Sequence, residues 1–357
     1  MSEKIPKGWK WVKLGEVVTL QRGYDLPKSK MKKGNIPVVG SNGIIGYHNK
    51  ATTKAPGITI GRSGNIGNAY LHKSDFWAHN TTLYVKDFKG NDVIFLFYLF
   101  KNIDFNQLNA GSAVPTLNRN HIYPIEVKIP IRIEDQKAIA EVLSSIDDKI
   151  DLLHRQNKTL EEIAMTLFRQ WFIEPTKDGL PEGWEEVSLG EIIEISSGKS
   201  IEKGKLKEKG LYPVLGANGE IGRTDDWLYE GELIYTGRVG TLGNVFIVFR
   251  NEKVWLTDNT LVIKPKKNEY FYFVYFTLKN AKLDEYNSGS TQPLIRQSDI
   301  KKIEIFLPKI NFLKDFEVIS RNLFTKIQFN TSQIQTLDKL RDTLLPKLIN
   351  GEVRVAV

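Results

Sequence analysis

The sequence contains no cysteine, only three methionines and only five histidines among its 357 residues. Without cysteine, disulfide bonds and thiolate metal sites are excluded. The histidines are scattered, which disfavours a zinc site or a catalytic histidine cluster. No apolar run approaches the roughly 18 residues that a membrane-spanning helix needs, and the start, MSEKIPKGWKW, lacks the apolar core of a signal peptide. These absences predict a cytoplasmic protein without a metal site or a membrane partner.

Familiar catalytic motifs are also missing. The GKS sequence at 198–200 resembles the end of a phosphate-binding loop, but that motif needs glycine five residues earlier, where Ile193 stands. The glycine-rich segment at 61–67 lacks the dinucleotide-binding spacing. The paired acids Asp147 and Asp148 lie on a predicted helix, where a solvated face is expected, and no Asn/Asp-Pro-Pro-aromatic motif of adenine methylation is present. The sequence therefore predicts no catalytic residue in this chain.

The main positive feature is a heptad repeat from about Glu134 to Phe172 that contains neither proline nor glycine. A helix of about 38 residues would be roughly 57 Å long, too long for the core of one domain. The same spacing returns between Phe316 and Leu348, after a globular-sized segment. We therefore predict two long helices that form an antiparallel intramolecular coiled coil; the alternative is that each helix packs on its own domain.

The predicted seam of this coiled coil contains mostly apolar residues. Its members are Ile139, Leu143, Ile146, Ile150, Leu153, Asn157, Leu160 and Leu167 in the first helix, and Leu323, Ile327, Asn330, Ile334, Leu337 and Leu344 in the second. A twofold axis at the midpoint of the first seam places Asn157 opposite Asn330. A buried asparagine pair costs stability but disfavours every slipped register. Ser320 and Arg341 also fall on the second seam and weaken it.

The rest of the chain is a tandem repeat. The matching segments are GWKWVKLGEVVTL at 8 and GWEEVSLGEIIEI at 183, IPVVGSNGIIG at 36 and YPVLGANGEIG at 212, GRSGNIGNAY at 61 and GRVGTLGNVF at 237, and GSAVPTLNRNHI at 111 and GSTQPLIRQSDI at 289. Short β-branched runs between Gly and Asn turns predict strands. The aromatic runs that begin at Val93 and Tyr270 contain no turn residues, which favours buried helices.

These observations predict an α+β fold with two similar β-rich domains joined by the two long helices, related by a pseudo-twofold axis. The expected segments are a first domain at 1–130, a first helix with linker at 131–175, a second domain at 176–310, and a second helix with tail at 311–357. The net charge of +8 is unevenly distributed, because the first domain has 18 Lys and Arg against 8 Asp and Glu. The second domain has 19 against 20. The excess in the first domain indicates a polyanionic partner.

Two domains held about a twofold axis by a spacer suit a protein that reads two half-sites on double-stranded DNA. Arginine between glycines, as at Arg62 and Arg238, can approach guanine closely. The DNA-binding candidates in the first domain are Arg22, Lys28, Lys30, Asn42, Arg62, Ser63, Asn65, His79, Asn80, Asn118 and Arg119. Those in the second domain are Lys199, Lys203, Lys205, Asn218, Arg238, Thr241, Asp258, Asn259, Gln292 and Arg296. Each residue alone also fits a turn, a cap or a solvated surface.

The openings GWKWVKLGEV and LPEGWEEVSLGEI, the NGIIG and NGEIG turns, GRSGNIG, and the first long helix together resemble the specificity subunit of type I restriction–modification systems, over almost the whole chain. This resemblance implies two target-recognition domains, each reading one half of a split, asymmetric DNA site, and no catalysis in this chain. It implies methylation (M) subunits that use S-adenosylmethionine and restriction (R) subunits that use ATP with Mg. It carries over no base-contacting residue, because these loops should differ between members.

Two other functions remain open from the residues alone: a DNA-cleaving or DNA-methylating enzyme with an unrecognised site, and a scaffold that binds proteins at its two ends. The ends of the long helices carry more apolar residues than one seam can bury. These are Phe168, Trp171, Phe172, Leu345 and Leu348. We expect part of this surface to cover the adjoining domain and part to meet helices of the methylation subunits.

Overall fold

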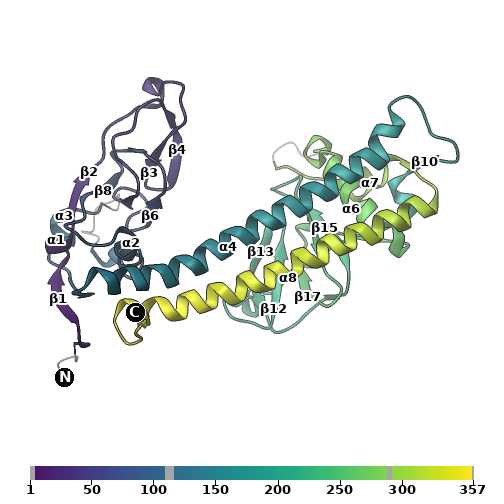
Figure 1. Ribbon diagram of the computed structural model, residues 1–357. Helices are drawn as coiled ribbons and strands as arrows, with labels where there is room; N and C mark the ends of the chain where they lie inside the picture. The colour runs from purple at the N-terminus through teal and green to yellow at the C-terminus, as the bar shows by residue number, and fades with distance from the viewer. Residues whose placement is uncertain (1–4, 109–115, 288–291, 356–357) are drawn as a thin grey trace. The chain divides into compact units, whose positions relative to one another are not determined.

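The computed structural model describes residues 5–108, 116–287 and 292–355. The chain forms two compact units, of which unit 1 contains 1–154 and 331–357 and unit 2 contains 155–330. Each unit holds one β-rich domain and part of two long helices, α4 (Ile133–Phe168) and α8 (Ile310–Ile349) (Figure 1). The predicted segments gave each long helix a region of its own, whereas both helices are divided between the units. Among the described residues, no helix is long and apolar enough to cross a membrane.

The domain of unit 1 contains three small sheets. An antiparallel pair joins β1 (Trp9–Lys13) to β9 (Glu126–Pro130), an antiparallel sheet has the order β2 (Thr19–Arg22), β8 (Thr82–Asp87), β5 (Gly57–Gly61) and β6 (Ala69–His72), and a mixed sheet has the order β4 (Gly43–His48), β3 (Ile36–Gly40) and β7 (Trp77–Ala78). The helices are α1 (Leu14–Val17), α2 (Val93–Lys101) and α3 (Arg119–Ile122), with the 3-10 turns η1 (Lys28–Lys30) and η2 (Phe105–Leu108).

The domain of unit 2 repeats this strand order and adds one short edge strand, β14. Its sheets are β10 (Glu185–Ser188) with β19 (Glu304–Leu307); β11 (Ile193–Ser197), β18 (Thr260–Pro265), β15 (Leu233–Gly237) and β16 (Val245–Val248); and β13 (Gly219–Thr224), β12 (Tyr212–Gly216), β17 (Lys253–Leu256) and β14 (Tyr229–Glu230). The shorter helices are η3 (Arg169–Ile173, a π-helix), η4 (Glu174–Thr176), α5 (Leu189–Ile192), η5 (Lys203–Lys205), η6 (Asn268–Tyr270), α6 (Phe271–Asn280), η7 (Leu283–Tyr286) and α7 (Gln297–Lys301). The tandem repeat in the sequence is thus a repeat of topology.

The two aromatic runs are helices, which confirms the prediction for both. In unit 1 the side chain of Asp92 caps α2 by accepting a hydrogen bond from the backbone N–H of Phe95, at 2.8 Å. Phe95 and Leu99 then pack into the core with residues of the four-stranded sheet such as Ile58. In unit 2 nearly all of α6 is buried. Burial on all sides explains why these helices carry no polar face.

Within each unit, part of α4 packs antiparallel on part of α8. In unit 1, Ile146, Ile150 and Leu153 form a cluster with Ile334, while residues earlier in α4 join a cluster that contains Leu348. In unit 2, the Nδ2 group of Asn330 donates a hydrogen bond to Oδ1 of Asn157, at 2.9 Å.

The asparagine register expected from the seam midpoint is therefore observed. Asn330 is fully buried, and its Oδ1 has no hydrogen-bond partner within the described residues. A buried amide that is only half satisfied costs stability, which fits a role in fixing the register.

The last turns of α4 differ from the expected seam. Phe168 and, in η3, Phe172 are buried beside Ala164, whereas Leu160 and Leu167 are only partly buried. The reason is that α4 turns a wider apolar face towards α6, where the ring of Phe168 stacks on Phe276 with centroids 5.8 Å apart. Part of the helix-end surface covers the adjoining domain, as predicted: Phe168, Phe172 and Leu348 are all buried within their own units. The contact of the rest with helices of the methylation subunits stays a prediction.

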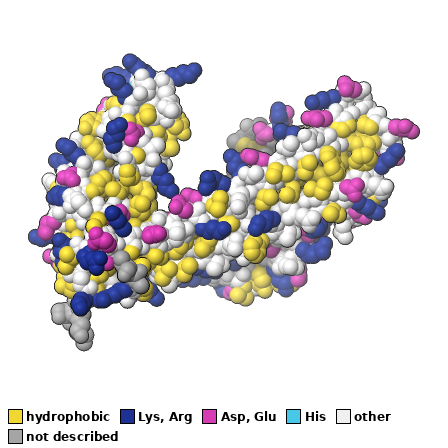
Figure 2. All heavy atoms as spheres, viewed as in Figure 1, with side chains coloured by type: hydrophobic (Ala, Val, Ile, Leu, Met, Phe, Trp, Pro, Cys, Tyr) yellow, Lys and Arg dark blue, Asp and Glu magenta, His cyan; other side chains and the backbone are white. Residues whose placement is uncertain are grey.

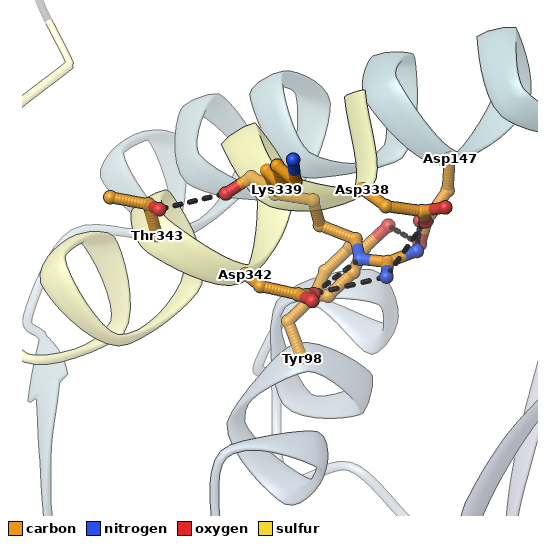
Figure 3. A network of polar contacts seen from close by, with 7 residues as sticks. Tyr98, Asp147, Asp338, Lys339, Asp342 and Thr343 are labelled. Carbon is orange, nitrogen blue, oxygen red and sulfur yellow. Dashed lines mark hydrogen bonds and ion pairs between the residues drawn. The ribbon is translucent and has the colours of Figure 1, made fainter. Parts of the chain in front are cut away.

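A polar network joins the domain of unit 1 to both long helices (Figure 3). The hydroxyl of Tyr98 on α2 donates to Oδ2 of Asp147 on α4, at 2.7 Å, and Nη1 of Arg341 on α8 donates to Oδ1 of the same carboxylate, at 3.0 Å. Arg341 also pairs with Asp338 and Asp342 of its own helix. Burial and the neighbouring Asp147 raise the pKa of Tyr98, so the hydroxyl keeps its proton and remains a donor.

The corresponding positions of unit 2 are apolar. A shift of 178 residues relates α2 to α6, and a shift of 177 relates α4 to α8, so that Tyr98 corresponds to Phe276 and Asp147 to Phe324. In the same way, Arg341 corresponds to Ala164 on α4. Phe276 and Phe324 are in ring contact at 6.0 Å. The contacts between the domain and the long helices therefore differ between the units: they are polar in unit 1 and apolar in unit 2.

Candidate nucleic-acid interface

A groove of about 500 Å³ in the first domain brings together four of the predicted DNA-binding residues. Arg22 ends β2, Arg62 follows β5, and Asn118 and Arg119 begin α3. The remaining lining residues are Gln21, Leu83 and Thr116. Residues far apart in the sequence thus meet because β2 and β5 lie in one sheet and the segment before α3 crosses its end.

The backbone around Arg62 is fixed on both sides. Its N–H donates to the carbonyl of Thr81 at 2.8 Å, and its own carbonyl accepts from Leu117 N–H at 2.8 Å. Gly61 is required, because a Cβ there would lie 2.1 Å from the carbonyl oxygen of Asn65. Gly64 has a left-handed φ of 80°, which favours glycine. These hydrogen bonds and glycines therefore hold the backbone around Arg62 in one conformation.

Two of the arginine side chains in the groove contact backbone carbonyls. Arg62 Nη1 reaches the carbonyl of Asn80 at 3.5 Å, and Arg119 Nη1 donates to the carbonyl of Leu20 at 3.2 Å. In the described part of the chain, none of the three guanidinium groups pairs with a carboxylate. Burial, followed by the nearby charge of Arg22, lowers the pKa of Arg62. The groove is thus an uncompensated positive site suited to a ligand rich in hydrogen-bond acceptors.

Thr81 connects three of the loops that carry candidates. Its carbonyl accepts from the N–H groups of Arg62 and Ser63, at 2.8 and 3.2 Å. Its hydroxyl accepts from Ser41 N–H at 3.2 Å and contacts Nδ1 of His79 at 3.1 Å. The β3–β4 turn, the loop after β5 and the β7–β8 loop therefore form one surface. Asn42 is exposed on the first of these loops, and Asn65 on the second.

Two candidates in the first domain make internal contacts instead of pointing freely to solvent. The amide of Asn80 donates to Oδ1 of Asp25 at 2.7 Å, and the ring of His79 is held by Thr81. Lys28 and Lys30 are exposed on η1, away from these contacts. Figure 2 shows dark blue side chains gathered over the segment between β2 and β4, where Lys28, Lys30, Lys32 and Lys33 are all exposed. This lysine-rich tip suits phosphate contacts.

The second domain builds the same arginine loop. Arg238 N–H donates to the carbonyl of Asn259 at 2.8 Å, and its carbonyl accepts from Ile295 N–H at 2.9 Å. A Cβ on Gly237 would lie 2.1 Å from the carbonyl oxygen of Thr241, as at Gly61. Gly240 has a φ of 85°, close to that of Gly64. Arg62 and Arg238 are therefore equivalent in structure as well as in sequence.

The residues around the two arginines differ. Ser197 stands where the first domain has Arg22, each directly before a glycine that packs on the strand β7 or β17. Gln297 stands in the position of Arg119, and in the amide orientation that satisfies both ends its Oε1 accepts from the Ser197 hydroxyl at 3.1 Å. Arg296 precedes α7 as Asn118 precedes α3. The second site thus has two arginines where the first has three.

The other candidates in the second domain lie on its loops, and several are already paired. Asn218 accepts from Asn244 at 2.8 Å, and Asp258 accepts from Ser200 at 3.1 Å. Lys205 forms an ion pair with Asp226 at 2.8 Å. The exposed candidates without such a pair within the described residues are Lys199, Lys203, Thr241, Asn259, Gln292 and Arg296. Because Lys207 also pairs, with Asp225, the lysine run is partly neutralised by the domain itself.

Sequence analysis missed Gln21, Thr81 and Thr116. The arrangement of the strands places Gln21 and Thr116 at the groove, and Thr81 holds the backbone of the Arg62 loop through its carbonyl. The glycine-rich starts of the repeat at 111–115 and 289–291 lie outside the described residues.

The family model for the type I restriction modification DNA specificity domain matches the chain twice, over residues 6–162 and 181–337. These matches cover most of the chain, each over one β-rich domain and the greater part of the helix that follows it. The chain belongs to the type I restriction–modification DNA specificity family. The sequence resemblance is confirmed by this match, and so is the expected fold class.

Named relatives agree with this assignment. The MjaIX specificity subunit of a type I restriction enzyme from Methanocaldococcus jannaschii is 28% identical, over 99% of this chain and 95% of its own length. The HindI specificity subunit from Haemophilus influenzae is 23% identical, over 69% of this chain and 72% of its own length. The crystal structure of a type I restriction-modification system S subunit from M. genitalium has the same fold, with a TM-score of 0.66 at 19% identity and 98% coverage of both chains.

Proposed function

We propose that this chain recognises a split DNA site, one half-site per domain, and directs the methylation and restriction subunits of a type I restriction–modification complex to that site. The observation that carries this proposal is the arginine loop built twice, once in each β-rich domain, with the same backbone hydrogen bonds at Arg62 and Arg238. The loops around it differ between the domains, which supports an asymmetric site. The positive excess of the first domain supplies phosphate attraction.

The long helices offer the surface for the other subunits. Exposed apolar side chains lie on α4 and α8 away from the domain cores. They are Leu152 and Leu340 in unit 1, and Ile163, Val318 and Phe329 in unit 2, each at least 40% exposed. We propose these exposed side chains as contacts for the methylation subunits. We assign the binding of S-adenosylmethionine, and of ATP with Mg, to those partner subunits and no catalytic step to this chain.

The test is selection from a duplex library by the chain together with its methylation subunits. We expect enrichment of two short segments separated by a spacer of fixed length and free sequence. Binding should weaken as salt rises, because phosphate contacts release counterions. Enrichment of one continuous segment, or of none, would contradict the split-site proposal.

Two further measurements address the alternatives. Methyl transfer or strand cleavage by the purified chain alone would contradict the non-catalytic assignment. Duplex binding that is absent at low salt would favour the protein scaffold. A chain that binds duplex DNA but needs added subunits for any chemistry fits the proposal.

A further inference from the structure

We infer that Arg62 and Arg238 each read a guanine, one in each half-site, and that they are the shared specificity determinant of the two domains. This inference rests on the proposed function and goes beyond it, because it assigns a base to a residue in each domain. Guanine presents two acceptors, N7 and O6, on its major-groove edge, and the planar fork of arginine matches both at once.

The rigidity of the loop favours base reading over phosphate binding. Reading a base requires a donor fork held in one orientation, whereas phosphate attraction needs only a positive charge within reach. The backbone N–H and carbonyl of Arg62 are both bonded inside the domain, and those of Arg238 are bonded in the same way. The exposed lysines of η1 have no such support and fit the phosphate role.

The glycines permit close approach of a base edge. Gly64 and Gly240 stand two residues after the arginines, and nothing lies within 4 Å of where a Cβ would be at either position. The backbone beside each arginine therefore carries no side chain and has free space next to it. This open space beside the loop is what close approach of a base edge to the protein backbone requires.

The absence of an acidic partner leaves the forks available. Within the described residues, no carboxylate pairs with Arg62 or Arg238, while other arginines such as Arg223, Arg321 and Arg341 are paired. In the first domain Arg22 and Arg119 line the same groove, whereas the second domain has Ser197 and Gln297 there. The neighbours therefore distinguish the half-sites, while the central arginine contact is common to both.

The experiment compares selected sites for complexes that carry Arg62→Gln, Arg238→Gln or neither substitution, each assembled from the full chain and its methylation subunits. We expect Arg62→Gln to reduce discrimination at one G·C pair of one half-site by roughly 5- to 150-fold. The other half-site should be read as before, which also shows that the variant is folded. Arg238→Gln should do the converse.

Arg62→Lys separates base reading from charge. It keeps the positive charge but loses the fork, so we expect the same relaxed base preference with an unchanged salt dependence. Lys28→Gln is the matched control on the same domain. It should weaken binding to all sequences equally and reduce the salt slope by about one, without changing base preference.

Several results would overturn the inference. If Arg62→Gln weakens binding uniformly and lowers the salt slope, Arg62 contacts phosphate. If Arg62→Gln and Arg238→Gln leave both selected half-sites unchanged, neither residue reads a base. A wild-type complex that selects no split site would refute the proposed function itself, whereas a split site that survives both substitutions would refute only this inference.

Discussion

At the scale of the residue, His72 shows how burial controls charge inside unit 1. Its Nε2 lies 2.8 Å from the hydroxyl of Thr59, and its ring packs on Phe76 with centroids 4.2 Å apart. Burial lowers the pKa of His72 to about 4. The neutral ring therefore belongs to the folded state, and protonation opposes folding.

The sign of the resulting pH dependence follows directly. An unfolded histidine binds a proton near pH 6.5, whereas folded His72 does so only near 4. The stability contributed by His72 is present above pH 6.5 and is lost as the pH falls towards 4, with a size of at most about 3 kcal/mol. We expect His72→Gln to remove this part of the pH dependence. The check is denaturant unfolding of both proteins at pH 7.5 and 4.5, and an equal loss in both would exclude His72 as the cause.

Some residues of the candidate DNA-binding site can be recognised from the sequence, and others cannot. Arg62 and Arg238 could be found because they sit between glycines at the same place in a repeat. Gln21 and Thr116 could not be found, since they become neighbours of Arg62 only when β2, β5 and the segment before α3 come together. The internal pairing of Asn80 with Asp25 was likewise not predictable, because the two residues are 55 positions apart. Side-chain partners depend on loop geometry that local sequence does not encode.

At the scale of the element, the heptad pattern predicts the long helices well where a helix is the partner. The asparagine register is correct because it follows from the seam positions and a twofold axis at the midpoint of the first seam. The pattern fails at the end of α4, where Phe168 and, in η3, Phe172 are the buried positions instead of Leu167. There the helix packs on α6 as well as on α8, and a wider apolar face than a two-helix seam becomes buried.

The polar network that joins α2 to both long helices in unit 1 leads to a prediction at the scale of the element. Asp147→Ala removes the acceptor of the Tyr98 hydroxyl and one of the three carboxylates that pair with Arg341. We expect unit 1 to lose roughly 1–3 kcal/mol of unfolding free energy, the usual penalty for buried groups left unsatisfied. Asp148→Ala on the same helix is the control, because Asp148 makes only an exposed pair with Lys73.

The apolar residues at the equivalent positions of unit 2 suggest a variant that should recover the stability lost in Asp147→Ala. Tyr98→Phe, Asp147→Phe and Arg341→Ala together copy the residues at the equivalent positions of unit 2, where the contact is apolar. We expect the triple variant to be more stable than Asp147→Ala, because replacing Tyr98 and Asp147 leaves no buried polar group behind and the exposed Asp338 and Asp342 are solvated. Denaturant unfolding of all variants measures the coupling. Additive losses in the triple variant would mean that the three residues do not act as one network.

At the scale of the whole molecule, each long helix contributes to both units. In α4 the division falls after His154, and in α8 after Asn330. A change in the length of both helices at these points leaves the contacts inside each unit in place. The spacing of the two half-sites should depend on this length, which sequence analysis could infer from the repeat of domain plus helix.

Insertions at the division test this dependence. One heptad added after His154 and another after Asn330 keeps both seams in phase and adds about 10 Å. That distance is roughly three base pairs, which turns the duplex by about a third of a turn and presents the wrong face. We expect this variant to bind poorly to any spacer. DNA bending can reduce the contrast, because smooth bending of a site costs only about 1–6 kcal/mol.

Three heptads added to each helix give about 32 Å, close to the roughly 34 Å of one duplex turn. The groove then returns to nearly the same face. We expect this variant to select the same two half-sites with a spacer longer by about nine or ten base pairs. Selection from duplexes with randomised spacers is the measurement, and the unmodified complex is the control. Recovery of the original spacer by the three-heptad variant would show that helix length does not set the spacing. Loss of half-site preference in that variant would instead show that the inserted heptads disturb the domains.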